Sequence, residues 1–286
     1  MSCTIERVAV IGAGTMGNGI AQTFAAHGAQ VALVDSSDAA LQKGLGTIEK
    51  SLARFVKKGA LAEEEAAAIL GRVTGSNELT AAAAESQLVV EAVVERAEVK
   101  RDVFQALDAA APAETILATN TSSISITEIA AHTGRADRVI GMHFMNPVPI
   151  MKLVEVIRGQ ETSDETTAQV VACSESLDKV PVEANDYPGF VSNRILMPMI
   201  NEAVFTLMEG VATKEGIDSV MKLGMAHPMG PLTLADLIGL DVCLDIMNVL
   251  HEGLGDSKYR PCPLLRRMVA AGRLGRKVGR GFYDYD

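Results

Sequence analysis

Short runs of aliphatic residues alternate with longer polar stretches over the first two thirds of the chain. An uninterrupted aliphatic run is typical of a strand buried in a parallel sheet, and the stretches between, rich in alanine, glutamate and lysine, are long enough for crossover helices. The runs occupy residues 8–11, 31–34, 88–93, 116–118, 139–142 and 153–157. This alternation predicts an α/β fold with a doubly wound, mostly parallel sheet.

The pattern changes after Pro188. Apolar residues then recur with helical spacing, and no strand is expected among the helices, which are predicted over residues 189–208, 214–223, 232–250 and 264–271. We therefore place the domain boundary within residues 185–189. An α/β domain of residues 1–186 precedes an all-α domain of residues 187–286.

A glycine-rich turn, Gly12-Ala13-Gly14-Thr15-Met16-Gly17, follows the first predicted strand and precedes a helical pattern. Gly12 permits the tight turn, Gly14 lets the backbone approach a pyrophosphate, and Gly17 lets the helix pack closely on the strand. The phosphates would face the unpaired N–H groups at the positive end of that helix. The turn predicts a Rossmann-type dinucleotide site, with a tight turn that binds nothing as the alternative.

Asp35 ends the second predicted strand and indicates which dinucleotide is bound. It lies ~20 residues beyond the glycines. At this spacing an acidic residue accepts hydrogen bonds from a ribose 2′-hydroxyl and repels a 2′-phosphate. Ser36 and Ser37 follow instead of an arginine. NAD is therefore favoured over NADP.

Polar residues gather where the later strands are predicted to end, which is the edge at which open α/β sheets bind ligands. His143 lies in one of these clusters, and histidine exchanges protons readily near neutral pH. Glu155 falls inside an aliphatic run, so its carboxylate needs a partner. It could orient His143 as the acid does in a catalytic triad. From spacing alone, two unrelated and structurally satisfied residues remain equally possible.

Asn193 is a second residue with two interpretations. It shares the apolar stripe of the helix predicted over residues 189–208. A polar residue there is either functional or a hydrogen-bonded core amide, and spacing alone leaves both open.

Residues 38–71 predict a helical hairpin inserted into the α/β domain. The first helix has one apolar face, Gly59 can end it, and the acidic residues 63–65 can begin the second. The opposite face of the first helix is basic and carries Lys43, Lys50, Arg54 and Lys57, with Ser51 and Lys58 beside them. That face is either a phosphate-binding surface or a solvated one.

Composition excludes several classes of protein. Hydrophobic residues make up 48% and charged residues 22%, which is ordinary for a globular chain. A net charge of −10 disfavours nucleic acid and anionic membranes as partners. We find no apolar run of membrane length, no signal peptide and no metal-ligand spacing among the scattered cysteines, Cys3, Cys173, Cys243 and Cys262. We therefore expect a cytoplasmic protein with idle thiols and no metal.

The glycine turn and five further motifs together resemble the short-chain L-3-hydroxyacyl-CoA dehydrogenase family, which includes the 3-hydroxybutyryl-CoA dehydrogenases. In chain order the five are Asn120-Thr121-Ser122-Ser123, His143-Phe144-Met145-Asn146-Pro147-Val148-Pro149 with residues 151–156, Pro188-Gly189-Phe190-Val191-Ser192-Asn193-Arg194, His227-Pro228-Met229-Gly230-Pro231 and Gly279-Arg280-Gly281-Phe282-Tyr283. The resemblance implies a Rossmann domain joined to a helical domain that forms a homodimer. It also implies NAD-dependent oxidation of a short-chain (S)-3-hydroxyacyl-CoA to the 3-ketoacyl-CoA, or the reverse reduction.

The resemblance further implies roles for individual residues. His143 corresponds to the catalytic base and Glu155 to the acid that orients it, while Ser122 and Asn193 correspond to residues that hold the substrate oxygen. The implied NAD contacts are Asp35, Glu95, Lys100, Asn120, Asn146 and Lys277, and the implied CoA contacts are Ser51 and Lys58. Two positions depart from the family pattern, because Met145 stands where an aromatic residue is common and Val278 where a small hydroxyl residue is usual.

Two other functions remain open at this point. One is that of a family relative that oxidises a free hydroxy or sugar acid and lacks a CoA site. The other is that of a non-enzymatic NAD-binding protein that keeps the fold.

Overall fold

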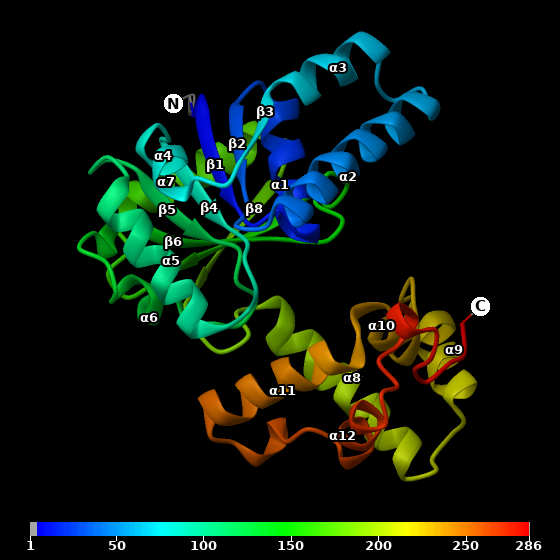
Figure 1. Cartoon of the computed structure of the whole chain (residues 1–286). Coiled ribbons are helices and arrows are strands. Elements are labelled where there is room, and N and C mark those ends of the chain that lie inside the picture. Colours follow the sequence, from blue (N-terminus) through cyan, green and yellow to red (C-terminus); the bar gives the residue numbers. More distant parts are fainter. Residues whose placement is uncertain (1–4, 286) are drawn as a thin grey trace. The chain divides into compact units, whose positions relative to one another are not determined.

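The computed structural model describes residues 5–285, and the chain divides into two compact units, Met1–Asp186 and Tyr187–Asp286, each with its own hydrophobic core (Figure 1). Among the described cysteines, Cys173, Cys243 and Cys262 are buried, and Cys3 lies outside the described residues. No described helix has both the length and the apolar character needed to cross a bilayer.

The first unit is built on a single sheet. Within the described residues, eight strands lie in the order β3-β2-β1-β4-β5-β6-β7-β8, and every neighbouring pair is parallel except β6 and β7. The strands are β1 (Arg7–Ile11), β2 (Gln30–Val34), β3 (Val73–Ser76), β4 (Leu88–Glu91), β5 (Ile116–Thr119), β6 (Val139–Phe144), β7 (Leu153–Arg158) and β8 (Val180–Asn185). The predicted mostly parallel α/β sheet is confirmed.

Two strands differ from the prediction because they form the edges of the sheet. β3 and β8 carry polar residues and are largely exposed, so neither shows the uninterrupted aliphatic run by which the buried strands are recognised. β8 even contains Pro181, which an edge strand tolerates. A third difference concerns β4, which ends at Glu91 rather than at Val93.

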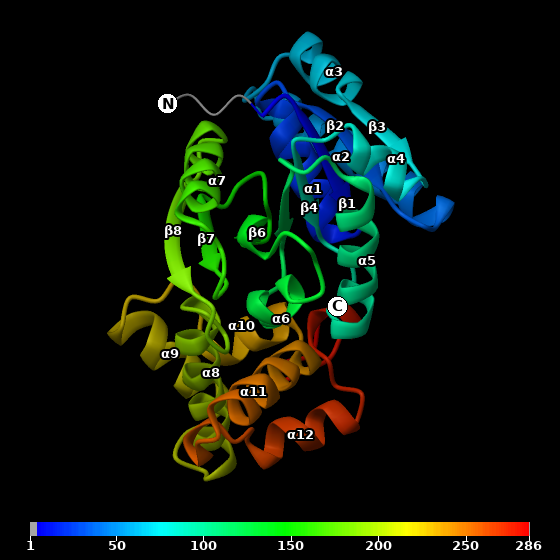
Figure 2. The same ribbon diagram turned by 90° about the vertical axis from the view of Figure 1, so that its left-hand side faces the viewer.

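Helices pack on the sheet of the first unit. They are α1 (Thr15–Ala26), α2 (Asp38–Lys57), α3 (Glu63–Gly71), α4 (Leu79–Ala84), α5 (Ala97–Ala110), α6 (Ile126–Ala130) and α7 (Asp164–Ser176), with a 3-10 turn at Ala136–Arg138. The main core joins α1 and α7 to the strands, and Phe24 of α1 meets Phe144 of β6 edge to face at 6.5 Å. Figure 2 shows α7 beside β7 and β8, which it contacts.

The helical hairpin predicted for residues 38–71 is confirmed as α2 and α3, which run side by side with their turn projecting from the sheet (Figure 1). Gly59 follows α2 with φ +68°, the left-handed conformation that ends many helices. Gly44 places α2 against the glycine turn, because a Cβ there would lie 2.7 Å from the Ala13 carbonyl oxygen. The hairpin is therefore anchored beside the candidate dinucleotide site.

The second unit is helical, as predicted. Its helices are α8 (Ser192–Met208), α9 (Lys214–Gly224), α10 (Pro231–Ile238), α11 (Leu240–Leu254) and α12 (Pro263–Ala270), with 3-10 turns at Ser257–Tyr259 and Arg276–Val278. The single helix predicted over residues 232–250 is wrong, because Gly239 adopts φ +110° and separates α10 from α11. The apolar pattern continues across this break, so periodicity alone conceals it.

Within the second unit, Asp236 of α10 binds the C-terminal segment. Its carboxylate is buried and accepts hydrogen bonds from the Phe282 and Tyr283 N–H groups, each at 2.9 Å, and from the Tyr285 hydroxyl at 2.9 Å. A Cβ at Gly281 would lie 1.9 Å from the same carboxylate. The Gly279–Tyr283 motif therefore has a structural role, since it closes the chain end onto α10.

Candidate active site

The glycine turn between β1 and α1 has the geometry that a bound pyrophosphate requires. Gly12 has φ +102°, and a Cβ there would lie 2.5 Å from the Ala92 carbonyl oxygen. A Cβ on Gly17 would lie 1.7 Å from the Gly12 carbonyl oxygen, so helix and turn touch directly. A Cβ on Gly14 would meet nothing within 4 Å, and no side chain caps α1 there. The positive end of α1 is thus open to an anion.

Asp35 lies beside this turn at the end of β2. Its carboxylate accepts hydrogen bonds from the Ala13 N–H at 2.9 Å and the Ser37 N–H at 3.0 Å. A cavity of about 550 Å³ adjoins it, lined by Ile11, Gly12, Gly14, Thr15, Met16, Val34, Asp35, Ser36, Asn77, Leu79, Ala92, Val93, Val94, Val99 and Val103. The apolar wall formed by the β4–α5 segment and α5 was not predicted from the sequence, although its position after a strand end was a usable signal.

His143 and Glu155 form a buried pair at the sheet's one antiparallel junction among the described strands. They lie directly opposite each other on β6 and β7, and His143 Nδ1 is 2.8 Å from Glu155 Oε2. The two residues are 8% and 2% exposed. A carboxylate on Nδ1 fixes the orientation of the imidazole ring and stabilises the imidazolium once it forms. The ring can therefore exchange a proton with a ligand through Nε2.

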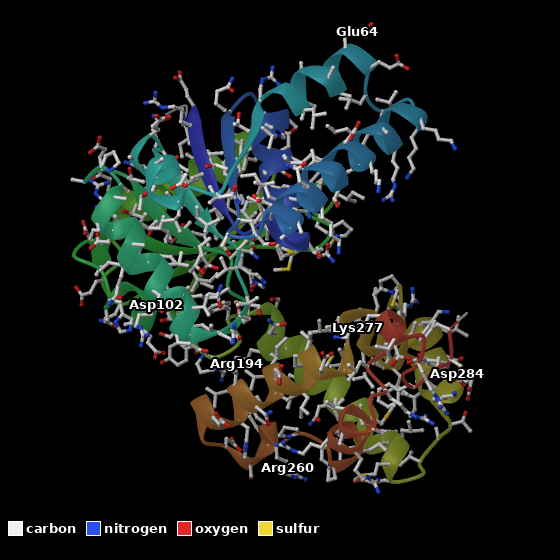
Figure 3. All side chains as sticks on the ribbon, in the orientation of Figure 1. Glu64, Asp102, Arg194, Arg260, Lys277 and Asp284 are labelled. Carbon is white, nitrogen blue, oxygen red and sulfur yellow. The ribbon has the colours of Figure 1, made fainter. Side chains whose placement is uncertain are left out.

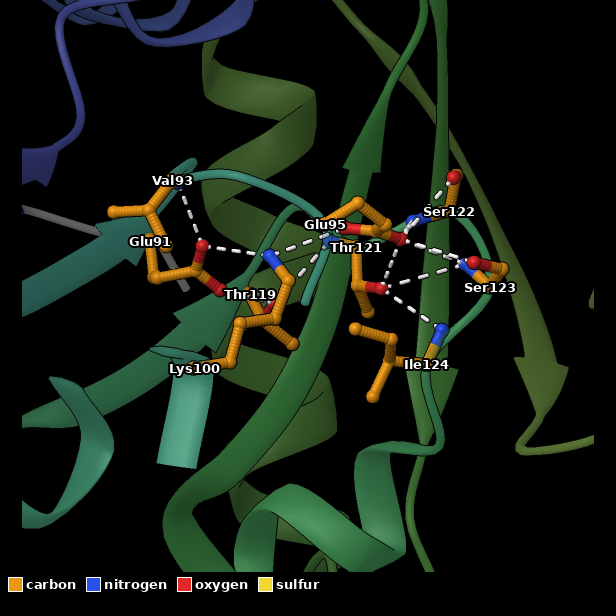
Figure 4. A network of polar contacts seen from close by, with 9 residues as sticks. All are labelled: Glu91, Val93, Glu95, Lys100, Thr119, Thr121, Ser122, Ser123 and Ile124. Atoms are coloured by element: carbon orange, nitrogen blue, oxygen red, sulfur yellow. Dashed lines mark hydrogen bonds and ion pairs between the residues drawn. The ribbon is translucent and has the colours of Figure 1, made fainter. Parts of the chain in front are cut away.

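Glu95 joins two of the segments that follow strands (Figure 4). Its Oε1 accepts hydrogen bonds from the Thr121 hydroxyl at 2.6 Å, from the Ser122 N–H at 2.8 Å and hydroxyl at 3.2 Å, and from both the N–H and the hydroxyl of Ser123 at 3.1 Å. Burial by itself raises the pKa of Glu95, but the Lys100 ammonium and the bonds from Thr121 and Ser122 outweigh it, and the pKa lies below its ordinary value. Glu95 is therefore an anion at neutral pH.

Lys100 and the unpredicted Glu91 lie beneath Glu95. Lys100 is 1% exposed, and its ammonium is 2.7 Å from Glu91 Oε1 and 3.2 Å from Glu95 Oε2. Glu91 is completely buried at the end of β4. The sequence does not predict the Glu91–Lys100 pair. The two residues are nine positions apart, and this spacing matches neither helical nor strand periodicity.

The two predicted asparagine contacts lie at the same edge of the sheet. Asn120 follows β5, and its Oδ1 accepts a hydrogen bond of 2.8 Å from the Phe144 N–H, so it ties the ends of β5 and β6 together. Asn146 lies just beyond β6, is exposed and precedes a cis peptide bond to Pro147.

The predicted CoA contacts belong to the hairpin. Ser51 lies on α2, and the exposed Lys58 is the residue that caps the C-terminal end of this helix, seven positions further along the same side. A second cavity, of about 200 Å³, opens beside the hairpin and includes Phe55, Lys152 and Lys179 in its lining. Lys179 donates hydrogen bonds to the Val148 carbonyl at 2.6 Å and the Met151 carbonyl at 2.8 Å, and burial, as the largest cause, lowers its pKa. The sequence analysis missed this lysine.

Asn193 and Lys277 belong to the second unit. Asn193 lies in the first turn of α8 and is 8% exposed. Lys277, labelled in Figure 3, places its ammonium 2.6 Å from both carboxylate oxygens of Asp241. Within the described residues there is no group of three or more His, Cys, Asp or Glu side chains that could hold a metal ion.

Comparison with known proteins points to one family. Residues 7–187 match the model of the 3-hydroxyacyl-CoA dehydrogenase NAD binding domain, and residues 189–285 match the C-terminal domain of the same family. A probable 3-hydroxybutyryl-CoA dehydrogenase of Bacillus subtilis is 58% identical over 282 residues, which cover 99% of this chain and 98% of the relative. The 3-hydroxybutyryl-CoA dehydrogenase of Bradyrhizobium diazoefficiens is 54% identical, with 100% and 97% of the two chains covered.

A solved structure gives the same result. The crystal structure of (S)-3-hydroxybutyryl-CoA dehydrogenase from Ralstonia eutropha superposes with a TM-score of 0.95 at 53% identity, covering 99% of this chain and 100% of that one. The fold is thus shared along nearly the whole length of both chains.

Proposed function

Because the chain belongs to the 3-hydroxyacyl-CoA dehydrogenase family, we propose that it catalyses the NAD-dependent oxidation of a short-chain (S)-3-hydroxyacyl-CoA to the 3-ketoacyl-CoA, and the reverse reduction. The observation that carries this proposal is the buried His143–Glu155 pair, on the same sheet as the glycine turn and Asp35. This arrangement combines a proton acceptor with a site suited to NAD.

The chemistry follows from the orientation of His143. Bound NAD would supply the hydride acceptor. His143 Nε2 takes the proton of the 3-hydroxyl group, and Glu155 stabilises the imidazolium that results. General-base assistance of this kind is worth about 10²–10⁴-fold in rate. In the reduction, the same imidazolium returns its proton to the developing alkoxide.

The cofactor contacts are proposed from the geometry of the first unit. The open end of α1 at Gly12-Ala13-Gly14-Thr15-Met16-Gly17 suits the pyrophosphate, and the Asp35 carboxylate suits the ribose hydroxyls. We assign Glu95, Asn120 and Asn146 to the nicotinamide half and keep Lys277 as an NAD contact in the second unit. Its tight pairing with Asp241 means that Lys277 would have to share its ammonium.

The substrate contacts are proposed on the basis of the family match. Ser122 and Asn193 hold the 3-oxygen, while Ser51 and Lys58 of the hairpin bind the phosphates of CoA. The hairpin is suited to this task because it presents cationic side chains on a chain whose net charge is −10. Without such a local surface, an acidic protein would repel a polyanionic substrate.

One assay separates the proposed function from its two alternatives. We expect NADH oxidation with acetoacetyl-CoA, slower oxidation of NADPH, and no detectable turnover of free acetoacetate. A relative specific for free acids would accept acetoacetate and ignore the CoA ester. A non-enzymatic NAD-binding protein would bind NADH, seen as a change in nicotinamide fluorescence, without consuming it.

We also propose that the protein is a cytoplasmic homodimer formed through the second unit. That unit exposes several large apolar side chains, among them Leu223 at 86%, Val211 at 71% and Ile195 at 68%. Exposed apolar side chains of this kind often mark an interface. Sedimentation equilibrium should give twice the chain mass, and a monomer at micromolar concentration would contradict the proposal.

A further inference from the structure

Lys179, which directly precedes β8, is a buried lysine that the proposed chemistry does not use. It is 7% exposed, and its ammonium donates hydrogen bonds to the carbonyl oxygens of Val148, at 2.6 Å, and Met151, at 2.8 Å. Burial of an ammonium costs free energy unless hydrogen bonds or an opposite charge offset the loss of water. Lys100 faces two carboxylates, whereas at Lys179 backbone carbonyls take their place.

The two carbonyls belong to the turn that connects β6 with β7. Within this turn the Pro147 carbonyl accepts hydrogen bonds from the Ile150 and Met151 N–H groups, each at 3.0 Å. The paired residues of β6 and β7 end at Phe144 and Val154, so the turn lies outside the ladder of the two strands. An ammonium carries three N–H donors, and it can therefore satisfy two carbonyls at once. Lys179 supplies to the turn the donors that a neighbouring strand supplies within the sheet.

The same turn is also held by α1. Val148 is 1% exposed, and a Cβ built on Gly19 of α1 would lie 2.9 Å from the Val148 Cβ. Val148 is thus fixed through its side chain by α1 and through its carbonyl by Lys179. Asn146, two residues earlier, is exposed at the end of this fixed segment.

We propose that Lys179 is a positioning residue, whose ammonium holds the turn at Val148 and Met151 and thereby fixes the place of Asn146. This inference rests on the proposed function, in which Asn146 contacts the nicotinamide half of NAD. Lys179 acts through the backbone of the turn. Its loss should therefore affect cofactor affinity more than the proton transfer by His143.

The surroundings of Lys179 offer a route for testing this role. A cavity of about 200 Å³ adjoins it, and Lys152, His27 and Asp178 also line this cavity. The Asp178 side chain is 81% exposed and lies 3.4 Å from His27 Nε2, and Lys152 donates to the Asp178 carbonyl at 3.2 Å. A small amine can therefore reach the position that the Lys179 ammonium leaves when the side chain is shortened.

The first test compares NADH affinity with turnover in Lys179→Ala. We expect the dissociation constant for NADH, measured by fluorescence titration, to rise roughly 10-fold, because small displacements of a contact residue cost up to ~10². At saturating NADH, kcat for acetoacetyl-CoA should fall less than about 3-fold, since β6 and β7 themselves align His143 with Glu155. Partial unfolding would give the opposite pattern, with fewer active molecules and an unchanged dissociation constant.

The second test is chemical rescue by ethylammonium or propylammonium. Either cation should restore the NADH affinity of Lys179→Ala in a saturable manner, because it can donate to the same two carbonyls. Lys179→Met fills the space with an apolar chain, so it should show the same loss of affinity and no response to amine. Lys152→Ala is the matched control, since it removes a lysine of the same cavity. It should keep the wild-type NADH affinity with or without amine.

A double-mutant cycle with Asn146→Ala tests whether Lys179 acts through Asn146. If it does, Lys179→Met adds less than about 2-fold to the loss of NADH affinity already caused by Asn146→Ala. An equal loss in both backgrounds would overturn the proposed route through Asn146.

The two levels of proposal fail in different ways. If the wild-type protein does not reduce acetoacetyl-CoA, the proposed function is wrong, whatever Lys179 does. If the wild type is active and both Lys179 variants bind NADH normally, the positioning role is wrong and the proposed function stands. Failure of both variants to fold, seen by circular dichroism, would leave Lys179 a purely structural role and equally overturn the inference.

Discussion

Carboxylates on or beside the strands of the first unit differ in the groups that face them. Glu155 faces an imidazole, Asp35 accepts two backbone N–H groups, and Glu91 faces an ammonium. The partner decides what each group can do, because a carboxylate held by N–H groups is fixed in place, whereas one paired with histidine supports proton transfer.

At this scale we expect Glu155→Gln to lower kcat for acetoacetyl-CoA reduction by about 10²–10⁴-fold, since the amide cannot compensate the imidazolium charge. The dissociation constant for NADH, measured by fluorescence titration, should change less than 3-fold. Glu183→Gln on the exposed strand β8 is a suitable control. Parallel losses of NADH binding and turnover would remove Glu155 from the proposed proton-transfer pair.

Single residues also show where sequence reasoning reached its limit. The pairing of His143 with Glu155 was proposed because a carboxylate in an aliphatic run needs a partner, and the structure shows that contact. Glu91 met the same criterion, yet its partner Lys100 lies on a different element, α5, and no sequence period joins them. Contacts between different elements depend on packing, which a single sequence does not display.

Whether a strand or helix could be predicted from the sequence depended largely on how much of it is buried. The strands with mainly aliphatic runs were found, and the exposed edge strands β3 and β8 were not. The hairpin was found because α2 is strongly amphipathic, with one buried apolar face and one basic face. The break at Gly239 was missed because its cause is a backbone angle and not a change in pattern.

The hairpin leads to a prediction about CoA recognition. Lys58→Ala should raise the KM for acetoacetyl-CoA about 3- to 10-fold, which corresponds to ~1 kcal/mol for an exposed ionic contact. A substrate truncated at pantetheine lacks the nucleotide phosphates and should be unaffected. Arg101→Ala, which removes an exposed cation from α5 outside the hairpin, serves as control. An equal rise in KM for both substrates would argue against a phosphate contact.

For the molecule as a whole, each unit has its own core, and the second unit is closed by the last few described residues. The C-terminal segment returns to Asp236, and the Tyr283 hydroxyl also bonds Asp218 of α9 at 3.0 Å. The motif Gly279–Tyr283 is one of those that carry the family resemblance. In the structure, this motif holds the C-terminal end of the chain against α10 and α9.

We expect removal of the Asp236 carboxylate to lower the free energy of unfolding without lowering the catalytic rate. Asp236→Ala leaves the buried Phe282 N–H and the part-buried Tyr283 N–H unpaired, at a cost of roughly 1–3 kcal/mol for the buried group. Urea unfolding followed by circular dichroism should show the decrease. Asp284→Ala breaks an exposed ion pair with Arg280 and should stay within about 0.5 kcal/mol of the wild type. A wild-type midpoint for Asp236→Ala would contradict the structural role of the motif.

The reversal of direction between β6 and β7 has a consequence for how this enzyme family could diversify. His143 and Glu155 are aligned by the backbone ladder itself, since they occupy facing positions of one antiparallel register. Five successive residue pairs hold that register, from Ile140–Arg158 to Phe144–Val154. Substitutions in the segment that connects the two strands, other than at Asn146, could therefore accumulate while the proton-handling pair stays aligned.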